Sequence, residues 1–262
     1  MGIGGERHEG IVLVTGGSGH LGQVVIEQLL KREYRVGSLD RVVPEFRDRH
    51  LAYTTVELSD PTATRLAVAD LVNDHKLRSV ISLVGGAVPA EYETDTGGWP
   101  SVNIFRDSLE QNLVSQYVVT TAVAPYLVRG GSGDRSLVYC GSINAQGVWS
   151  KVAYSAAKAG LEALTRVGAA RLGLHGVRVA AVAAGTIVPA KDASVDEELM
   201  RQLVNTVPLG RLADPAEVAK VLIGVAIDFH HVTGQVFNVD GGQSIQRGFH
   251  NLDQYLERGS EL

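Results

Sequence analysis

The chain has 262 residues, enough for one large α/β domain or two smaller ones. Its net charge of −5 and pI near 5.9 argue against nucleic acid or an anionic membrane surface as a partner. The single cysteine, Cys140, excludes an intramolecular disulfide. The N-terminal stretch MGIGGERHEG has no apolar core of signal-peptide length, and no apolar run is long enough for a membrane helix. We therefore expect a cytoplasmic protein.

Short apolar runs alternate with longer segments of helical periodicity along the whole chain. Strands are expected at residues 11–14, 35–39, 52–58, 79–84, 136–140, 177–183 and 235–239. Helices are expected at residues 21–31, 101–128, 152–174 and 214–226, and one more is expected to begin after Asp60. Asp60 and Asp214 would cap their helices, with Pro61 in the first turn of the former, and Pro125 would kink or end the helix at 101–128.

This alternation predicts the α/β class, with a doubly wound parallel sheet of about seven strands and helices on both faces, as in a Rossmann fold. Several of the strands are apolar on both faces, which is typical of parallel strands covered by helices. The sequence has no internal repeat, low-complexity run or interdomain linker, so residues 1–262 are expected to form a single domain.

A glycine-rich stretch, VTGGSGHLG, follows the first strand and opens the first helix. Gly16, Gly19 and Gly22 lie three residues apart, in the context that a dinucleotide site requires. One glycine would make the tight turn, one would let backbone amides approach a pyrophosphate, and one would let the helix pack on the sheet. The alternative is an ordinary βα turn.

Asp40 ends the second strand just beyond 20 residues after this turn. A carboxylate there would accept hydrogen bonds from ribose hydroxyls and repel a 2′-phosphate, which favours NAD over NADP. The adjacent Arg41 would instead be able to hold that phosphate, so NADP stays an alternative.

Ser142, Tyr154 and Lys158 form the candidate catalytic group. Tyr154 and Lys158 lie four residues apart and share a face of the expected helix, so the ammonium would favour the phenolate and create a general acid or base. Ser142, at the end of a strand, would donate a hydrogen bond to a carbonyl or developing alkoxide. The alternative is a solvated helix face.

The chain resembles the short-chain dehydrogenase/reductase family, in its single-domain branch. The resemblance rests on TGGSGHLG, NLVSQYVVTTAVAPYL, GS…YSAAKAG and the stretch from Pro208 to Gly242, and covers nearly the whole chain. It implies hydride transfer between a nicotinamide and a carbonyl or secondary alcohol, with Tyr154 as the acid–base. Lys158 would lower the pKa of Tyr154 and hold the nicotinamide ribose. Ser142 would orient the substrate oxygen, and Asn112 would support a proton relay. A homodimer or homotetramer is also implied.

The glycine turn and the resemblance together predict the binding residues. Expected cofactor contacts are Gly16, Ser18, Gly19, His20, Leu21, Asp40, Arg41, Leu58, Gly85, Tyr154, Lys158, Gly185 and Ile187. Expected substrate contacts are Ser142, Gln146, Trp149 and Tyr154. No metal site is expected, because the eight histidines show no ligand spacing.

Five departures from the branch's usual pattern stand out. A glycine at Gly19 rather than at His20 resembles the epimerase-type branch, and VGGAV at residues 84–88 replaces the usual N-N-A-G, whose asparagines help to stabilise the sheet. Ala184 replaces a proline, and Glu57 stands where an aspartate commonly contacts adenine. The spacing from Ser142 to Tyr154 is also one residue shorter than usual.

Substrate selection is expected from three variable stretches, residues 86–100, 143–153 and 187–207, the last resembling a mobile lid. Lys191 and Asp192 within the lid are expected to belong to a solvated loop rather than to touch substrate. The tail at residues 243–262 is expected to form either an amphipathic helix or a frayed terminus.

The expected function is an NAD(P)-dependent oxidoreductase acting on a small-molecule carbonyl or alcohol. Two alternatives stay open. One is a dehydratase or epimerase that uses a transient hydride, suggested by Gly19. The other is a dinucleotide-binding redox sensor without turnover, suggested by the changes at residues 84–88 and at Ala184.

Overall fold

The computed structural model describes residues 10–45, 47–73, 75–86, 88–92, 98–130, 133–147, 151–190 and 196–245. These residues form a seven-stranded sheet in the order β3-β2-β1-β4-β5-β6-β7, with every neighbouring pair parallel. The strands are β1 (Ile11–Thr15), β2 (Arg35–Asp40), β3 (Leu51–Thr55), β4 (Leu77–Ser82), β5 (Arg135–Ser142), β6 (Val177–Ala184) and β7 (Val236–Val239). The predicted doubly wound fold is confirmed.

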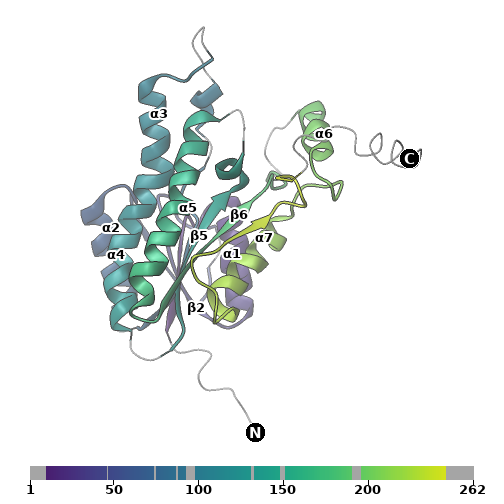
Figure 1. Cartoon of the computed structure of the whole chain (residues 1–262). Helices are drawn as coiled ribbons and strands as arrows, with labels where there is room; N and C mark the ends of the chain where they lie inside the picture. The colour runs from purple at the N-terminus through teal and green to yellow at the C-terminus, as the bar shows by residue number, and fades with distance from the viewer. Residues whose placement is uncertain are drawn as a thin grey trace.

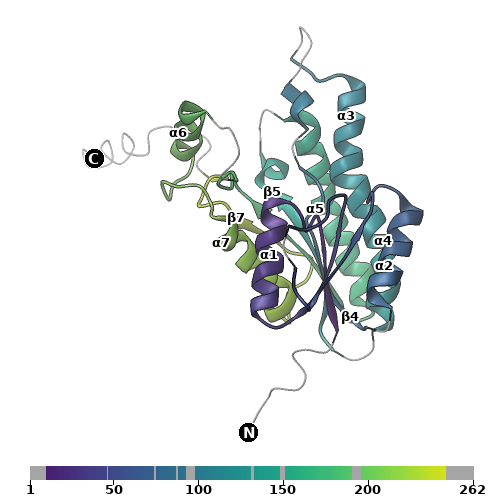
Figure 2. The ribbon, with the colours of Figure 1, turned by 180° about the vertical axis from the view of Figure 1, so that it is seen from behind.

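Helices cover both faces of the sheet (Figures 1 and 2). On one face lie α2 (Pro61–Val72), α4 (Ser115–Arg129) and α5 (Val152–Gly173), and on the other lie α1 (His20–Lys31) and α7 (Pro215–Ile223). Each face buries its own cluster of apolar side chains, with Leu13, Leu137 and Leu161 in one and Val14, Ile81 and Leu222 in the other. The strands are therefore apolar on both sides, as a covered parallel sheet requires.

The long helix expected at residues 101–128 has three parts. They are α3 (Val102–Leu109), a π-helical turn η2 (Glu110–Val114) and α4. Pro125 lies inside α4 and does not end it, because the helix continues for one more turn. The buried guanidinium of Arg135 then donates to the carbonyls of Leu127 and Val128 at 2.5 and 3.1 Å, which satisfies acceptors at the helix end.

Two strands stop earlier than expected. The strand expected at residues 52–58 ends at Thr55, which pairs with Asp40, and the one expected at 79–84 ends at Ser82, which pairs with Thr15. Beyond these points the chain leaves the sheet and forms loops at its carboxyl edge. The strand order reverses between β1 and β4 at this edge, which is where open α/β sheets bind their ligands.

A helix occupies part of the segment expected to be a lid. It is α6 (Glu197–Asn205), and Asp196 caps it by accepting a hydrogen bond from the Glu198 backbone N–H at 2.8 Å. Figure 1 shows α6 set apart from the sheet and from α7. Lys191, Asp192 and most of the tail, residues 246–262, lie outside the described residues. Within the described part of the chain, every helix is too short or too polar to cross a membrane.

Candidate active site

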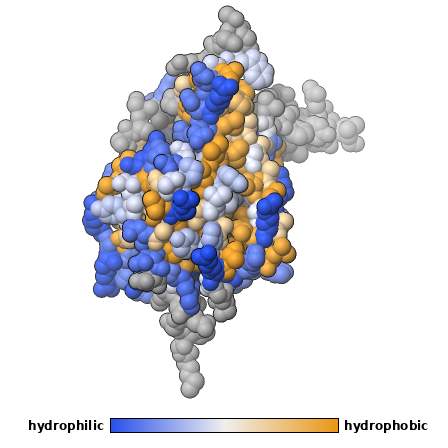
Figure 3. All heavy atoms as spheres, turned by 90° about the vertical axis from the view of Figure 1, so that its left-hand side faces the viewer, coloured by the Kyte–Doolittle hydropathy of each residue, from blue (hydrophilic) through white to orange (hydrophobic). Residues whose placement is uncertain are grey.

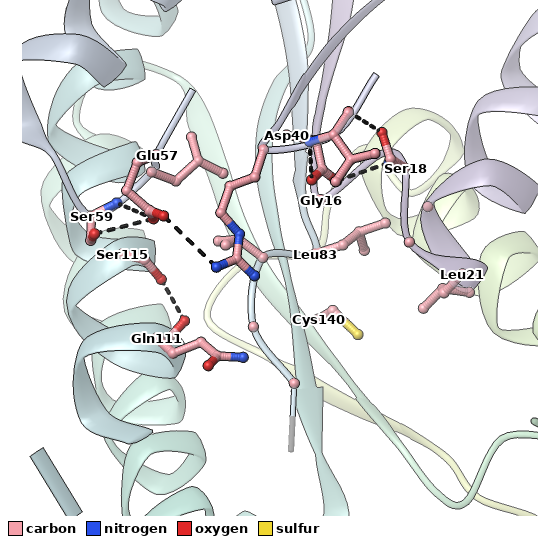
Figure 4. A pocket seen from close by; sticks show the side chains of 18 of the residues that line it. Gly16, Ser18, Leu21, Asp40, Glu57, Ser59, Leu83, Gln111, Ser115 and Cys140 are labelled. Atoms are coloured by element: carbon pink, nitrogen blue, oxygen red, sulfur yellow. Dashed lines mark hydrogen bonds and ion pairs between the residues drawn. The ribbon is translucent and has the colours of Figure 1, made fainter. Parts of the chain in front are cut away.

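A cleft of about 630 Å³ opens at the carboxyl edge of the sheet, between the glycine-rich turn and the start of α5 (Figure 4). Eleven of the thirteen expected cofactor contacts line it, namely Gly16, Ser18, Gly19, His20, Leu21, Asp40, Arg41, Leu58, Gly85, Tyr154 and Lys158. The tertiary structure therefore brings the glycine turn, the end of β2 and the tyrosine–lysine pair to one cavity.

Close backbone packing shapes the glycine turn. Gly16 has φ +71°, and a Cβ there would lie 3.1 Å from the backbone of Leu83 and Val84. A Cβ on Gly22 would overlap the carbonyl oxygen of Gly16 and lie 2.7 Å from the Cα of Gly17. These two glycines are therefore required by the contacts among turn, helix and neighbouring strand.

Gly19 differs, because a Cβ there would meet only the Gly16 carbonyl oxygen, at an ordinary 3.4 Å. Protein packing alone does not require this glycine. Gly19 and His20 are both exposed on the cleft, at the start of α1, where backbone N–H groups lack helical partners. The displaced glycine thus leaves the backbone open to a phosphate, and the cradle fits a dinucleotide.

Asp40 is tied to the glycine turn. Its Oδ2 accepts a hydrogen bond from the Ser18 backbone N–H at 2.9 Å, and the Ser18 hydroxyl donates to the Val42 carbonyl at 2.6 Å (Figure 4). Its Oδ1 accepts only a long 3.3 Å bond from the Val42 N–H, which leaves capacity for ribose hydroxyls.

Arg41 is paired with a carboxylate across the cleft. Its guanidinium lies 3.8 Å from Glu57, whose other oxygen accepts from the N–H and hydroxyl of Ser59 at 3.3 and 3.1 Å (Figure 4). Glu57 therefore pairs with Arg41, the cation that would favour a 2′-phosphate at this end of the cleft.

Tyr154 and Lys158 lie one turn apart on α5, and both line the cleft. Lys158 is 4% exposed, and its ammonium donates to the Cys140 carbonyl at 2.9 Å and lies 5.4 Å from the centroid of the Tyr154 ring. Burial raises the pKa of the Cys140 thiol, although Lys158 acts in the opposite direction. The half-buried Cys140 thiol beside this pair therefore stays protonated near neutral pH.

Ser142 and Gln146 do not line the cleft, and each has partners elsewhere. The Ser142 hydroxyl, at the end of β5, donates to the side chain of Asn144 at 3.1 Å and accepts from its N–H at 3.2 Å. The Gln146 amide bonds to Glu162 at 2.8 Å and to Asn238 at 2.7 and 3.0 Å. Their contact with substrate stays a prediction. Trp149 lies outside the described residues.

Gly185 and Ile187 also lie away from the cleft lining. A Cβ on Gly185 would come within 2.7 Å of the Asp240 backbone, so packing against the turn after β7 requires this glycine. Ile187 forms an isolated parallel bridge with Ala213. Both residues join the start of the expected lid to the body of the protein, and their contact with a cofactor stays a prediction.

Asn112 is fully buried in the π-helical turn η2. Its side chain accepts from the Gly86 N–H at 2.8 Å and donates to the carbonyls of Gly86 and Ser108 at 3.0 Å each. It thereby holds the loop after β4, in which Gly85 has φ +125° and could not carry a Cβ because of Asn112.

Sequence reasoning missed a buried network that replaces the usual asparagines after β4. Gln116 accepts from the Ser82 hydroxyl at 2.6 Å and donates to the Val84 carbonyl at 2.6 Å, and Ser82 bonds to Thr15 at 2.9 Å. The lost asparagine bonds therefore have local substitutes. The signal was a glutamine on the apolar face of a helix, which needs buried partners.

A second missed residue is Glu91, whose buried carboxylate binds the start of α5. Among the described residues, no group of three histidine, cysteine, aspartate or glutamate side chains is placed to hold a metal ion.

A family model described as enoyl-(acyl carrier protein) reductase matches residues 23–244. An uncharacterised oxidoreductase of Schizosaccharomyces pombe is 32% identical over 241 residues, which cover 88% of this chain and 90% of that protein. An acetoacetyl-CoA reductase of an Acinetobacter species is 27% identical over 246 residues, covering 88% and 96%.

A solved structure titled as a short chain dehydrogenase of Leptospira borgpetersenii with bound NAD+ superposes with a TM-score of 0.81. It is 22% identical, covers 91% of this chain and 94% of its own, and supports the fold. The family model and the S. pombe relative, each spanning most of the chain, show the family directly. The chain belongs to the short-chain dehydrogenase/reductase family and is an NAD(P)-dependent enzyme of that family.

Proposed function

We propose that this enzyme transfers a hydride between NAD(H) and a small carbonyl or secondary alcohol, with Tyr154 as the acid–base. The observation that carries the proposal is the meeting of Tyr154, Lys158 and the glycine cradle at one cleft. The Gln116 network favours an enzyme with turnover rather than a redox sensor. It supplies hydrogen bonds to the loop at residues 84–88, in which the usual asparagines are replaced.

A bound nicotinamide would supply the hydride in reduction and accept it in oxidation. The remaining chemistry belongs to the chain. In reduction the Tyr154 hydroxyl gives its proton to the carbonyl oxygen, and in oxidation the phenolate takes the alcohol proton. The ammonium of Lys158, buried and held by the Cys140 carbonyl, stabilises that phenolate. Ser142 would have to exchange its bond to Asn144 for one to the substrate oxygen.

The cofactor proposed is NAD rather than NADP. Asp40 faces the glycine turn with a free lone pair, and Arg41 is paired with Glu57. A 2′-phosphate would meet the Asp40 carboxylate and would have to compete with Glu57 for the guanidinium. A neighbour of the same fold is titled with bound NAD+, which is in keeping with this choice.

The test is a turnover assay with NADH and NADPH. Purified protein is mixed with each cofactor and a panel of 3-oxoacyl thioesters, sugars and simple ketones, and the near-ultraviolet absorbance of the reduced nicotinamide is followed. The thioesters are included because one relative is named an acetoacetyl-CoA reductase. Consumption with NADH supports the proposal. Tight cofactor binding without consumption of any carbonyl would favour a sensor.

The lid is proposed to span residues 187–207. At its two ends, the buried amide of Gln243 donates to the hydroxyls of Thr186, just before the lid, and Thr206 at 3.1 and 2.8 Å, and it accepts from the Thr186 N–H at 2.9 Å. One side chain therefore joins the two ends of the segment. This supports a lid whose two ends are both held to the turn after β7.

We also propose that two copies associate through α4 and α5. The face shown in Figure 3 carries a band of apolar side chains. Exposed apolar residues in this part of the fold include Val114 (38%) at the end of η2, Tyr117 (56%) on α4 and Val167 (53%) on α5. Apolar patches of this kind mark protein interfaces. Light scattering should give a dimer or tetramer for the native chain and smaller particles for Tyr117→Asp combined with Val167→Asp.

A further inference from the structure

Glu91 is a buried carboxylate that the proposed mechanism does not use. It lies in the short 3₁₀ turn η1 (Pro89–Tyr92) after β4, outside the lining of the cleft, and is 2% exposed. Its Oε1 accepts from the Ser108 hydroxyl at 2.6 Å, and its Oε2 accepts from the Tyr154 backbone N–H at 3.0 Å. Burying a carboxylate is costly unless hydrogen bonds stabilise it, and both of its oxygens have one.

The bond to Tyr154 supplies a cap that α5 lacks. Tyr154 is the third residue of the helix, so its N–H has no partner within the helix. The N-cap residue, Lys151, makes no side-chain cap. In three other helices the N-cap residue itself provides a carboxylate, namely Asp60 for α2, Asp196 for α6 and Asp214 for α7. In α5 the carboxylate comes from a residue 63 positions earlier in the chain.

The same carboxylate connects Tyr154 to the loop after β4. Glu91 binds the hydroxyl of Ser108, whose carbonyl accepts from the Asn112 side chain at 3.0 Å. The Asn112 side chain in turn forms hydrogen bonds with both the N–H and the carbonyl of Gly86. A continuous set of bonds thus runs from the loop through two buried helical residues to the backbone of the acid–base residue.

The location of Tyr154 relative to Lys158 therefore depends on two anchors. The Lys158 ammonium is held by the Cys140 carbonyl, and the Tyr154 backbone is held by Glu91. Without the second anchor the first turn of α5 would fray, because the Tyr154 N–H would lose its partner, while Lys158 lies one turn further into the helix. The phenol would then move and the ammonium would not.

We propose that Glu91 is a positioning residue for Tyr154, capping α5 from the loop after β4 and keeping the phenol in register with Lys158 and the cleft. The inference rests on the proposed role of Tyr154 as acid–base. Glu91 lies outside the lining of the cleft and acts through the backbone of Tyr154.

Three variants at this network and one matched control test the proposal. Glu91→Ala removes both hydrogen bonds. Glu91→Gln keeps them, since its amide oxygen accepts from Tyr154 and its amide nitrogen donates to the Ser108 hydroxyl. Ser108→Ala removes one support of the carboxylate. Glu217→Gln is the control, because it makes the same change in the capping box at the start of α7, away from the cleft.

We expect the kcat of Glu91→Ala to fall about 10–100-fold, because small misplacements of a reacting group cost this much. Its dissociation constant for NADH should stay within about twofold of wild type, since Glu91 does not line the cleft. Glu91→Gln should recover most of the kcat, Ser108→Ala should be intermediate, and Glu217→Gln should match wild type. The pH profile of kcat should change in Glu91→Ala only.

Hydrogen–deuterium exchange of amides 152–155 provides a readout independent of turnover. These amides should exchange at least about tenfold faster in Glu91→Ala, and at the wild-type rate in Glu217→Gln.

Unchanged exchange or unchanged kcat in folded Glu91→Ala overturns the inference, as does a kcat loss matched by an equal loss of NADH affinity. If Glu91→Ala does not fold, wild-type kcat in Ser108→Ala overturns it. Absence of turnover in wild type overturns the proposed function instead, and exchange still decides whether Glu91 anchors Tyr154.

Discussion

The two sides of the cleft are built by different kinds of contact. On the cofactor side, the glycine turn is shaped by backbone atoms in close contact, so that Gly16 and Gly22 have no room for a Cβ. On the catalytic side, the loop after β4 and the start of α5 are held by side-chain bonds from Asn112, Gln116 and Glu91. The first side is sensitive to an added atom, and the second to a lost hydrogen-bond partner.

The two sides meet at Lys158, which allows their functions to be separated. Tyr154→Phe should lower kcat by about 10²–10⁴-fold while leaving NADH affinity near wild type, because only the proton-transfer group is removed. Lys158→Met should lower kcat similarly and also weaken NADH binding, since Lys158 is expected to hold the nicotinamide ribose. Stopped-flow or steady-state kinetics with NADH titrations measure both. Wild-type kcat in Tyr154→Phe would refute the acid–base role.

Alanine substitutions at two glycines of the turn should separate the effect of protein packing on stability from the effect of backbone access on NADH binding. Gly22→Ala should cost about 1–3 kcal/mol of unfolding free energy by overpacking and weaken NADH binding as well. Gly19→Ala should keep its stability to within about 0.5 kcal/mol, because the added Cβ meets an ordinary contact, and should lose NADH affinity alone. Urea unfolding and fluorescence titration give the two quantities. Equal destabilisation of both variants would show that the contrast is wrong.

Cofactor choice should depend on the carboxylates around Arg41. Asp40→Ser removes the charge that repels a 2′-phosphate, and Glu57→Gln releases the guanidinium. Together they should shift the ratio of kcat/KM for NADPH over NADH toward NADPH by about 10–100-fold, which corresponds to about 1.4–2.8 kcal/mol. Glu57→Gln alone should give a smaller shift of the same sign. A double variant that keeps the wild-type ratio would exclude this pair as the determinant.

The smallest effect is expected away from both sides, at the cap of α7. Hydrogen bonds from Arg211 and from the Asp214 backbone lower the pKa of Glu217 from 4.5 to about 2. Because the folded-state pKa is lowered, its contribution to stability is present above pH 4.5 and is lost as the pH falls toward 2. Urea midpoints of wild type and Glu217→Gln should differ at neutral pH and converge in acid. A constant difference across this range would contradict the assignment.

How much of this could be predicted from sequence differs between the two sides. The glycine spacing, Asp40 and the Tyr154–Lys158 pair were readable because each is a local pattern next to a strand or on one helix face, and the structure brings them to one cleft. Gln146 was expected near substrate, yet in the structure its amide bonds to Glu162 and Asn238. Glu91 was missed because nothing in its immediate neighbours distinguishes it from a surface residue. Gln116 was missed although it lies on the apolar face of a helix, because its partners come from another part of the chain.

The sequence by itself therefore determined the parallel sheet, its layers and the residues that meet at its carboxyl edge, because hydrophobic periodicity and strand order place those positions without knowledge of side-chain partners. Only the tertiary structure decided how the catalytic side is held together. Its bonds join residues as far apart as Glu91 and Tyr154 or Gln116 and Val84, and which buried polar groups pair depends on the packing of whole helices against the sheet.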